Sequence, residues 1–452
     1  MSGDIGNPLF GLSPEEQKKL AENLLGKQQS LTQGGSERKR PHSVAIPERF
    51  GQFKELPEYK HLQIQRVVAD KMNILNPFFT CHETKAKGRT KIDGQEFLNF
   101  STYDYVGLNG HPEINAAATG AMEEFGTSAG ASRLVAGERP QHRKLEKSLA
   151  DFYGVDDAVI FVSGHATNVS TLQTLLCARD AVYHDSLAHN SIVLGATLSG
   201  AARYSYAHND CQALERLLQQ TRVKHERAII VTEGLFSMDG DIAQLPELVR
   251  LKRDFTCFLM VDEAHALGVL GATGRGSAEY FGIDSRDVDI WMGTLSKTLC
   301  GCGGFIAGCA ELIELLKFTA SGFVYSVGMP PPMAAASCKA LELMRREPER
   351  TARLQAISRF FLAEAKKRGL NTGHAEGYAV IPLIVGNSLV AGLLAAAMFS
   401  RRINVLPIIY PVVEEGMARL RFFLSSEHQE KDILIALDAV AEELPKAVDK
   451  AR

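Results

Sequence analysis

The middle of the chain alternates short apolar runs with segments of helical spacing, and this pattern limits the folds open to it. Between residues 110 and 310, seven candidate strands are separated by helical or loop segments. Parallel strands need crossover connections that are usually helices, so the alternation predicts an α/β fold with a largely parallel sheet covered by helices. The predicted strands are Ala158–Val162, Ala181–His184, Ala202–Tyr206, Ala228–Thr232, Cys257–Asp262, Asp289–Gly293 and Gly303–Gly308.

The segments on both sides of this region predict further structure. A chain of 452 residues is too long for one compact core. A helical pattern runs from about Pro57 to Leu75, and Asp93-Gly94 marks a hairpin turn. Beyond about Pro332 we expect one long helix and then a second, smaller α+β domain with strands at Tyr378–Val385, Asn404–Tyr410 and Ala418–Leu424. The predicted parts are an N-terminal helix and flexible arm (1–50), a segment packing with the small domain (51–104), a large domain (105–335) and a small C-terminal domain (336–452).

The first fifty residues differ in composition from the rest. Ser13-Pro14-Glu15-Glu16 combines an N-cap, a proline at N1 and a glutamate at N3, which predicts a helix to about Gly26. A polar stretch with the basic cluster Arg38-Lys39-Arg40 follows. Two interpretations stay open: a solvated arm and linker, or a docking element for a partner.

Charge and cysteine usage argue against several classes of protein. Lys+Arg 50 against Asp+Glu 53 gives a net charge of −3, whereas a nucleic-acid binder needs a basic surplus. The eight cysteines are scattered, and Cys300-x-Cys302 has neither zinc nor disulfide spacing, which favours a metal-free protein of the cytoplasm. Met1–Phe10 does not resemble a signal peptide, and the apolar helical stretch Leu389–Phe399 is too short to span a bilayer.

One lysine follows a predicted strand, in a position from which it can reach a ligand bound at the edge of the sheet. Lys297 ends the run Gly293-Thr294-Leu295-Ser296-Lys297, directly after a predicted strand and before the glycine-rich Gly301–Gly304. Ligands of α/β sheets bind at the carboxyl ends of the strands. Taken alone, Lys297 is more simply a solvated lysine.

The neighbouring segment Val261-Asp262-Glu263-Ala264-His265 changes the interpretation of Lys297. Asp262 ends an apolar strand, where an unpaired carboxylate is costly, and a pyridinium nitrogen would satisfy it. His265, three residues on, can hydrogen-bond a ring hydroxyl. The simpler alternatives are a helix N-cap for Asp262 and a satisfied core histidine for His265.

Three further strand ends carry polar side chains. Ser163-Gly164-His165 opens a predicted helix, whose N-terminal amides suit a phosphate. His189 offers an imidazole that can stack on a ring, and Ser237 offers a hydroxyl. Pyridoxal phosphate (PLP) needs an amine, a partner for its pyridine nitrogen, a phosphate cup and a ring clamp. The chain supplies a candidate for each, so we expect PLP as the cofactor.

Together these segments resemble the α-oxoamine synthases of PLP fold type I, the family of 8-amino-7-oxononanoate synthase, glycine C-acetyltransferase, 5-aminolevulinate synthase and serine palmitoyltransferase. The resemblance covers roughly residues 75 to 440 and implies the fold-type I architecture, with a large PLP-binding domain at 105–335. The motifs that carry it are Tyr105-Val106-Gly107-Leu108, Val162–Asn168, Asp185–His189, Glu233–Asp241, Asp262–His265, Gly293–Lys297 and Ala418-Arg419-Leu420-Arg421.

The resemblance implies a role for each site residue. Lys297 forms the Schiff base with PLP and then removes the Cα proton. Arg421 binds the amino-acid carboxylate, which suits a planar guanidinium. Ser326 reaches the phosphate in the neighbouring subunit of a homodimer. The other implied roles are Asp262 at the pyridine nitrogen, His265 at the ring hydroxyl, His189 on the ring face, Ser237 beside the ring, and Ser163, Gly164, His165 and Thr294 in cofactor binding.

Three positions depart from the family pattern. Asp104 stands near the substrate carboxylate, where members often carry asparagine, and an ionised aspartate there would repel that carboxylate. Ile409 replaces an arginine of soluble bacterial serine palmitoyltransferases, which weakens that assignment. His165 replaces the common phenylalanine and adds a phosphate donor.

The implied reaction is a decarboxylative Claisen condensation in lipid or secondary-metabolite biosynthesis. A small amino acid (glycine, alanine or serine) and an acyl thioester give an α-amino ketone, carbon dioxide and the free thiol. The donor is an acyl-CoA or an acyl-carrier protein, which the N-terminal arm would dock. Another fold-type I reaction, such as that of an aminotransferase, uses the same lysine and aspartate and stays the alternative. A non-catalytic scaffold subunit is disfavoured because Lys297 and Asp262 are both present.

Overall fold

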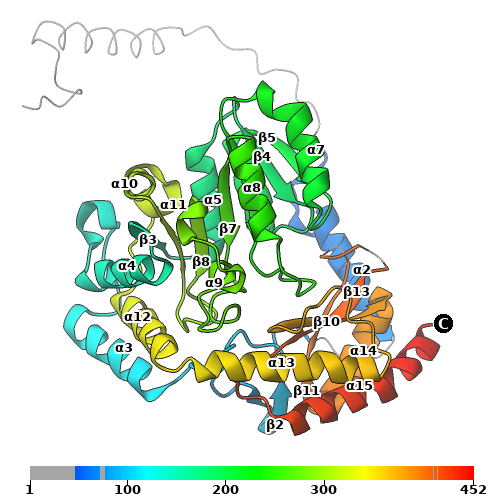
Figure 1. Ribbon diagram of the computed structural model, residues 1–452. Coiled ribbons are helices and arrows are strands. Elements are labelled where there is room, and N and C mark those ends of the chain that lie inside the picture. The colour runs from blue at the N-terminus through cyan, green and yellow to red at the C-terminus, as the bar shows by residue number, and fades with distance from the viewer. Residues whose placement is uncertain (1–45, 72–76, 411, 415) are drawn as a thin grey trace, which may run out of the picture. The chain divides into compact units, whose positions relative to one another are not determined.

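The computed structural model describes residues 46–71, 77–410, 412–414 and 416–452 (Figure 1). The chain forms two compact units, residues 1–73 and 74–452. In the first unit, two short 3₁₀ turns (Glu48–Gly51 and Phe53–Glu55) precede helix α2 (Pro57–Lys71). The predicted helix at Ser13 and the basic cluster at Arg38 lie outside the described residues.

A seven-stranded sheet forms the centre of the second unit, as the strand pattern predicted (Figure 1). Neighbouring strands are parallel except at β9, which runs antiparallel to β3 and β8. All seven predicted strands are present, with ends within one residue of the expected ones. In sheet order the strands are β3 (Asp157–Phe161), β9 (Gly304–Gly308), β8 (Ile290–Thr294), β7 (Phe258–Asp262), β6 (Ala228–Glu233), β4 (Ala181–Asp185) and β5 (Ala202–Tyr206).

Helices cover both faces of this sheet because its strands alternate between two apolar cores. On β7, Met260 belongs to one core, and Leu259 and Val261 belong to the other. The core of Met260 is shared with α5 (Gly164–Leu175), α6 (Asn190–Ser199), α10 (Ala310–Thr319) and α11 (Ser321–Val324). The other core is shared with α4 (Pro140–Tyr153), α7 (Cys211–Thr221), α8 (Leu245–Asp254), α9 (Ser277–Phe281), α12 (Pro331–Arg346) and, beside α12, α3 (Pro112–Phe125). Short helical turns lie at Arg133–Gly137, Arg222–Lys224 and Ser285–Asp287.

Two three-stranded sheets lie beyond the large one. Asp93 and Gly94 form the predicted hairpin turn, and both have positive φ (49° and 69°), which matches the twist of a two-residue hairpin. The first sheet joins β1 (Arg89–Ile92) and β2 (Gln95–Asn99) to β11 (Ile403–Asn404), and the second joins β10 (Val380–Gly386), β13 (Ala418–Phe423) and β12 (Leu406–Ile408).

The prediction of one long helix after Pro332 was wrong, because the chain forms two helices there. Helix α12 ends at Arg346, and α13 (Glu349–Lys367) begins after Pro348. A proline lacks the N–H of a continuing helix and disfavours helical geometry in the residue before it. Glu347 accordingly leaves the helical region, with φ −124° and ψ 61°. The remaining helices, α14 (Ser388–Ser400) and α15 (Glu430–Ala451), pack against each other (Figure 1).

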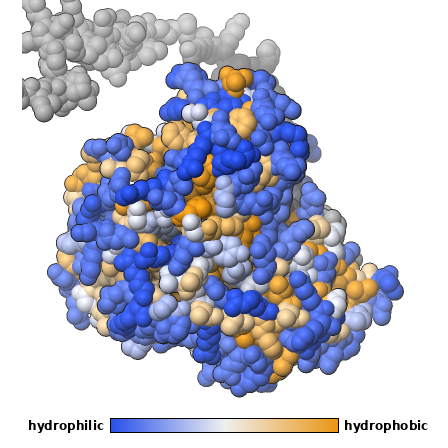
Figure 2. All heavy atoms as spheres, in the orientation of Figure 1, coloured by the Kyte–Doolittle hydropathy of each residue, from blue (hydrophilic) through white to orange (hydrophobic). Residues whose placement is uncertain are grey.

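Figure 2 shows a mostly hydrophilic face with scattered apolar side chains. Among the described residues, no helix combines the length and apolarity needed to cross a bilayer. All eight cysteines are free thiols, so no disulfide cross-links the chain.

Candidate active site

The predicted site residues gather at the carboxyl edge of the seven-stranded sheet. Thr294 is the last residue of β8, and Lys297 follows three residues later. Asp262 is the last residue of β7, the neighbouring strand. His189 follows β4 and caps α6, so the parallel register brings these loops to one edge.

Lys297 places a half-buried amine at this edge. Its Nζ lies 5.4 Å from the centre of the Tyr103 ring. Burial lowers the pKa of Lys297 to about 8, although the nearby carboxyl groups of Asp262 and Glu233 act in the opposite direction. A sizeable fraction of this amine is therefore neutral, and hence nucleophilic, near neutral pH.

Asp262 is held by hydrogen bonds at both carboxylate oxygens. Oδ1 accepts from the backbone N–H of Ala264 (2.9 Å), as a helix N-cap would. Oδ2 accepts from Nδ2 of Asn168 (2.8 Å), which also donates to the Ser191 hydroxyl (2.9 Å). That hydroxyl is bonded to Nδ1 of His189 (2.7 Å). One network thus fixes the carboxylate of Asp262 and the imidazole of His189.

His189 and His265 are both uncharged at neutral pH. Burial lowers the pKa of His189, and it holds the pKa of His265 well below its usual value. Nδ1 of His265 lies 2.7 Å from the hydroxyl oxygen of Tyr105. The His265 ring stacks on Phe423, with the planes 12° apart. Both imidazoles therefore have fixed orientations.

The loop after β3 presents the N-terminus of α5 to the site. The Ser163 hydroxyl caps this helix by accepting from the backbone N–H of Ala166 (3.4 Å). A Cβ atom at Gly164 would stand 2.9 Å from Oγ1 of Thr294, so only glycine fits there without displacement. The ring of His165 lies 6.4 Å from that of His189, centre to centre. The first amides of α5 are thus available to an anion beside Thr294.

Strand β13 sends two arginines onto the Ser237 loop. Nη1 of Arg421 donates to the carbonyl oxygen of Ser237 (3.0 Å), and its guanidinium lies 4.7 Å from the centre of the Phe423 ring. Arg419 forms a buried ion pair with Asp239 (2.8 Å). Nε of Arg421 is buried without a hydrogen-bond partner, which leaves a donor for an anionic ligand.

Comparison with known proteins decides the family of the chain. The family model for aminotransferase class I and II matches residues 95–440. The 8-amino-7-oxononanoate synthase of Geobacter sulfurreducens is 42% identical over 359 residues, which cover 78% of this chain and 90% of the relative. That of Methylococcus capsulatus is 40% identical over 364 residues, which cover 80% and 93%. The chain belongs to the α-oxoamine synthase family.

Solved structures support the same family assignment for this chain. A serine palmitoyltransferase from Sphingomonas wittichii matches with a TM-score of 0.83 at 26% identity, over 87% of this chain and 99% of its own. An 8-amino-7-oxononanoate synthase from Francisella tularensis matches with a TM-score of 0.68 at 27% identity, over 77% and 98%. The predicted fold type I and PLP dependence are confirmed, and the synthase is an acyltransferase.

The carboxyl edge of the synthase fits PLP chemically. The aldehyde of PLP needs an amine, which Lys297 supplies. A protonated pyridine nitrogen needs an anionic partner, and Asp262 is stabilised as an anion by its two hydrogen bonds. The phosphate needs N–H donors, which the first turn of α5 at Gly164 offers.

The structure shows the surroundings of Asp104, the residue expected to repel a substrate carboxylate. It lines a cavity of about 400 Å³ that also contacts Lys297. Its Oδ1 accepts from the backbone N–H groups of Leu108 (2.8 Å) and Asn109 (3.1 Å), and burial raises its pKa to about 6. Asp104 therefore braces its own turn through Oδ1, whereas its Oδ2 is buried without a hydrogen-bond partner.

Ser326 lies apart from the other predicted residues in a single chain. It follows α11, and its hydroxyl donates to the carbonyl oxygen of the next residue, Val327 (3.3 Å). Its predicted place in a second copy's site stays a prediction.

Sequence reasoning assigned no role to several residues at the edge. Glu233 ends β6 beside Asp262. His208, two residues after β5, is bonded to Asp185 through Nδ1 (2.9 Å) and to Asp241 through Nε2 (3.0 Å). Glu233 ends one strand of the large sheet and His208 follows another. Their position at strand ends is the sequence signal that could have identified them.

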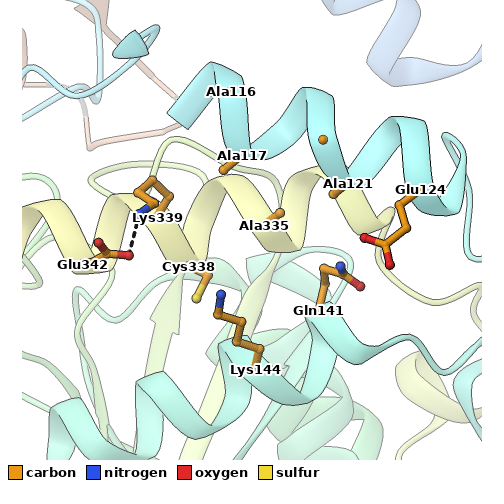
Figure 3. A pocket seen from close by; sticks show the side chains of 11 residues that line it. Ala116, Ala117, Ala121, Glu124, Gln141, Lys144, Ala335, Cys338, Lys339 and Glu342 are labelled. Atoms are coloured by element: carbon orange, nitrogen blue, oxygen red, sulfur yellow. Dashed lines mark hydrogen bonds and ion pairs between the residues drawn. The ribbon is translucent and has the colours of Figure 1, made fainter. Parts of the chain in front are cut away.

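A second pocket, between α3, α4 and α12, contains none of the predicted residues (Figure 3). Its floor is formed by small side chains such as Ala117, Ala121 and Ala335, and the ion pair of Lys339 with Glu342 (2.7 Å) lies at its rim. No titratable group at the sheet edge faces this pocket, so the candidate site is the one at Lys297.

Proposed function

We propose that the synthase condenses glycine, alanine or serine with an acyl thioester, and releases the free thiol, carbon dioxide and an α-amino ketone. The observation that carries this is the meeting of three groups at one sheet edge: the amine of Lys297, the anchored carboxylate of Asp262 and the guanidinium of Arg421. An amine and a carboxylate serve PLP in general, whereas a guanidinium beside them serves an amino-acid substrate.

PLP, when bound, supplies an electron-withdrawing ring that stabilises negative charge at Cα of the amino acid. Lys297 would hold it through its amine. The other proposed contacts are Asp262 at the pyridine nitrogen, His189 on the ring face, His265 at the ring hydroxyl, Ser237 beside the ring, Ser163, Gly164, His165 and Thr294 in cofactor binding, and Ser326 supplied by a second copy of the chain.

Lys297 also acts as the base that takes the Cα proton. A base works best when its pKa lies near the working pH, and burial brings the pKa of the free Lys297 amine to about 8. Its position three residues after β8 puts it on the same edge as Asp262, so one side chain serves attachment and then proton transfer.

Arg421 and His189 orient the two substrates. The free Nε–H of Arg421 gives the amino-acid carboxylate a charge-assisted hydrogen bond. The carboxylate of Asp104 lines the cavity beside Lys297 and accepts hydrogen bonds from its own turn. His189, fixed by Ser191, keeps the acyl thioester on one face.

The name of the relatives indicates which amino acid and which acyl group to test first. In 8-amino-7-oxononanoate, the 8-amino-7-oxo end corresponds to alanine without its carboxylate, joined to a seven-carbon dicarboxylic acyl group. Ile409, in place of the arginine of soluble serine palmitoyltransferases, is in line with this choice over serine and palmitate. We propose a homodimer in the cytoplasm, with CoA or an acyl-carrier protein as the thiol carrier.

A substrate screen tests the proposal. Glycine, alanine and serine are each paired with acyl-CoA and acyl-carrier thioesters, including the seven-carbon dicarboxylic acyl group, and carbon dioxide and product mass are followed. We expect carbon dioxide release to require both substrates, with Lys297→Ala as the inactive control. Amino-group transfer to a keto acid, without thioester-dependent carbon dioxide release, would support the aminotransferase alternative instead.

A further inference from the structure

Two buried carboxyl groups stand side by side at the edge of the sheet. Glu233 ends β6 and Asp262 ends β7, and the two residues are direct partners in the parallel register. Residues paired in this way point to the same face of the sheet. Their exposed fractions are 3% and 4%, so little water screens them from each other. Two such neighbours do not both ionise at neutral pH.

The hydrogen bonds decide which of the two keeps its proton. Both oxygens of Asp262 accept hydrogen bonds, from Ala264 and Asn168. Of Glu233, Oε2 accepts from the backbone N–H of Ser237 (3.1 Å), whereas Oε1 is buried without a partner. A buried ionised oxygen without a donor is costly. Burial and the charge of Asp262 accordingly raise the pKa of Glu233 to about 8.

Glu233 also joins the two loops that carry predicted site residues. Its carboxyl group accepts from the backbone N–H of Ser237 (3.1 Å) and lies close enough to the backbone N–H of His189 for that group to lower its pKa. Ser237 is in turn bonded to Arg421 through its carbonyl oxygen. A neutral carboxylic acid still accepts the hydrogen bond of Ser237 through its carbonyl oxygen, so holding this loop does not require a charge.

We propose that Glu233 is a positioning residue that acts as an uncharged acid, holding the backbone of Ser237 beside His189 while leaving Asp262 as the single negative charge for the pyridine nitrogen of PLP. The inference rests on the PLP dependence of the family and not on the identity of either substrate. A second carboxylate would compete with Asp262 for the positive charges at this edge.

The charged groups around Glu233 give the pH dependence its sign. They are Asp262 on β7, Lys297 after β8 and Arg421 on β13, with the neutral His189 on the loop after β4. Because the folded pKa of Glu233 is raised, its contribution to stability is complete below pH 4.5 and is lost as the pH rises through about 8. Ionisation of Glu233 also favours the protonated form of the group at Lys297.

Three variants test the proposal. Glu233→Gln keeps the acceptor oxygen and cannot ionise, and Glu233→Ala removes the acceptor. Glu226→Gln is the matched control, because Glu226 is an exposed glutamate just before the other end of β6, where it pairs with Arg179. Three quantities are measured from pH 5 to 9.5: the thermal midpoint of the apoprotein, the cofactor absorbance without substrates, and kcat and KM.

The expected results separate positioning from general structural loss. In the apoprotein, Glu233→Gln reduces the fall in thermal midpoint between pH 5 and 9 that the unmodified chain and Glu226→Gln show. In the loaded protein, it moves the alkaline change of cofactor absorbance to lower pH, because the negative charge that favours the protonated group at Lys297 no longer forms. Glu233→Ala lowers kcat by about tenfold, because the hydrogen bond that holds the Ser237 loop is lost, and changes KM little. The spectral readout needs no substrate, so it stands even if the condensation fails.

Two outcomes overturn the proposal. If Glu233→Gln loses as much kcat at pH 7 as Glu233→Ala while both fold, the residue is needed as an anion. If the apoprotein's thermal midpoint and the cofactor absorbance of Glu233→Gln follow those of Glu226→Gln at every pH, Glu233 does not titrate in the folded protein, and the uncharged acid is excluded.

Discussion

The hydroxyl oxygen of Tyr105 lies 2.7 Å from Nδ1 of His265, and both side chains are buried. Burial holds the pKa of the imidazole well below its usual value and raises that of the phenol well above its own, so neither is charged at neutral pH. With the phenol O–H donated to Nδ1, the imidazole proton stays on Nε2. Tyr105 therefore selects the tautomer that gives His265 a donor for the PLP hydroxyl.

Tyr105→Phe removes this hydrogen bond and little else. We expect kcat to fall about two- to tenfold, the cost of one hydrogen bond, and the cofactor absorbance of the resting enzyme to shift. Steady-state kinetics and an absorbance titration measure both effects. Tyr280→Phe on α9 is the control and should leave both unchanged. An unaltered spectrum in Tyr105→Phe would show that the phenol does not determine the tautomer.

His208 lies between two buried carboxylates and ties the β4 loop to the Ser237 loop. Its nitrogens are bonded to Asp185 and Asp241. Burial alone would lower its pKa, but the two hydrogen bonds outweigh burial and raise the pKa to about 10. The charged imidazole therefore stabilises the folded state fully below pH 6.5, and this contribution is lost as the pH rises through about 10.

His208→Gln should be destabilised by about 3 kcal/mol at pH 6.5, because two carboxylates lose their charged partner. The difference from the unmodified chain should shrink as the pH approaches 10. Urea unfolding at pH 6.5, 8 and 9.5 measures it. A difference that stays constant with pH would mean that His208 acts through packing alone. His225→Gln is a control, because His225 is hydrogen-bonded to Tyr204 and not to a carboxylate.

The sequence could predict the sheet and the residues that end its strands, because apolar runs and polar residues at their ends are local features. Lys297, Asp262 and His189 follow strands directly and were found in this way. Glu233 ends a strand and His208 follows one, but their roles depend on which strands are neighbours and which oxygens lie close together. Those facts arise from cross-strand register and side-chain contacts.

The break between α12 and α13 was missed for a different reason. Pro348 was visible in the sequence, and a proline ends a helix or allows one to begin at its first turn. Because the apolar spacing continues on both sides of Pro348, the sequence pattern predicts one helix. The place of Ser326 could not be read from one chain at all, since it concerns a second copy.

Gly164→Ala tests the close approach of α5 to β8. The added Cβ would stand 2.9 Å from Oγ1 of Thr294, so the first turn of α5 must move from the place where its amides face the site. We expect PLP affinity to fall about tenfold or more, because several N–H donors to the phosphate are misplaced together. Reconstitution of the apoprotein with PLP measures this. Gly120→Ala in α3 has open space at its Cβ and should bind PLP normally, whereas normal binding by Gly164→Ala would place the phosphate elsewhere.

Arg421→Lys asks whether the guanidinium binds the amino-acid carboxylate. Nη1 is already used by the carbonyl oxygen of Ser237, so the substrate depends on the remaining donors, including the unpartnered Nε. Lysine keeps the charge but has neither the planar fork nor an Nε–H. We expect KM for the amino acid to rise about ten- to hundredfold, the range for charge-assisted hydrogen bonds, while KM for the thioester changes little. Arg353→Lys, on an exposed position of α13, is the control. An equal rise in both KM values would assign Arg421 to the Ser237 loop and not to the carboxylate.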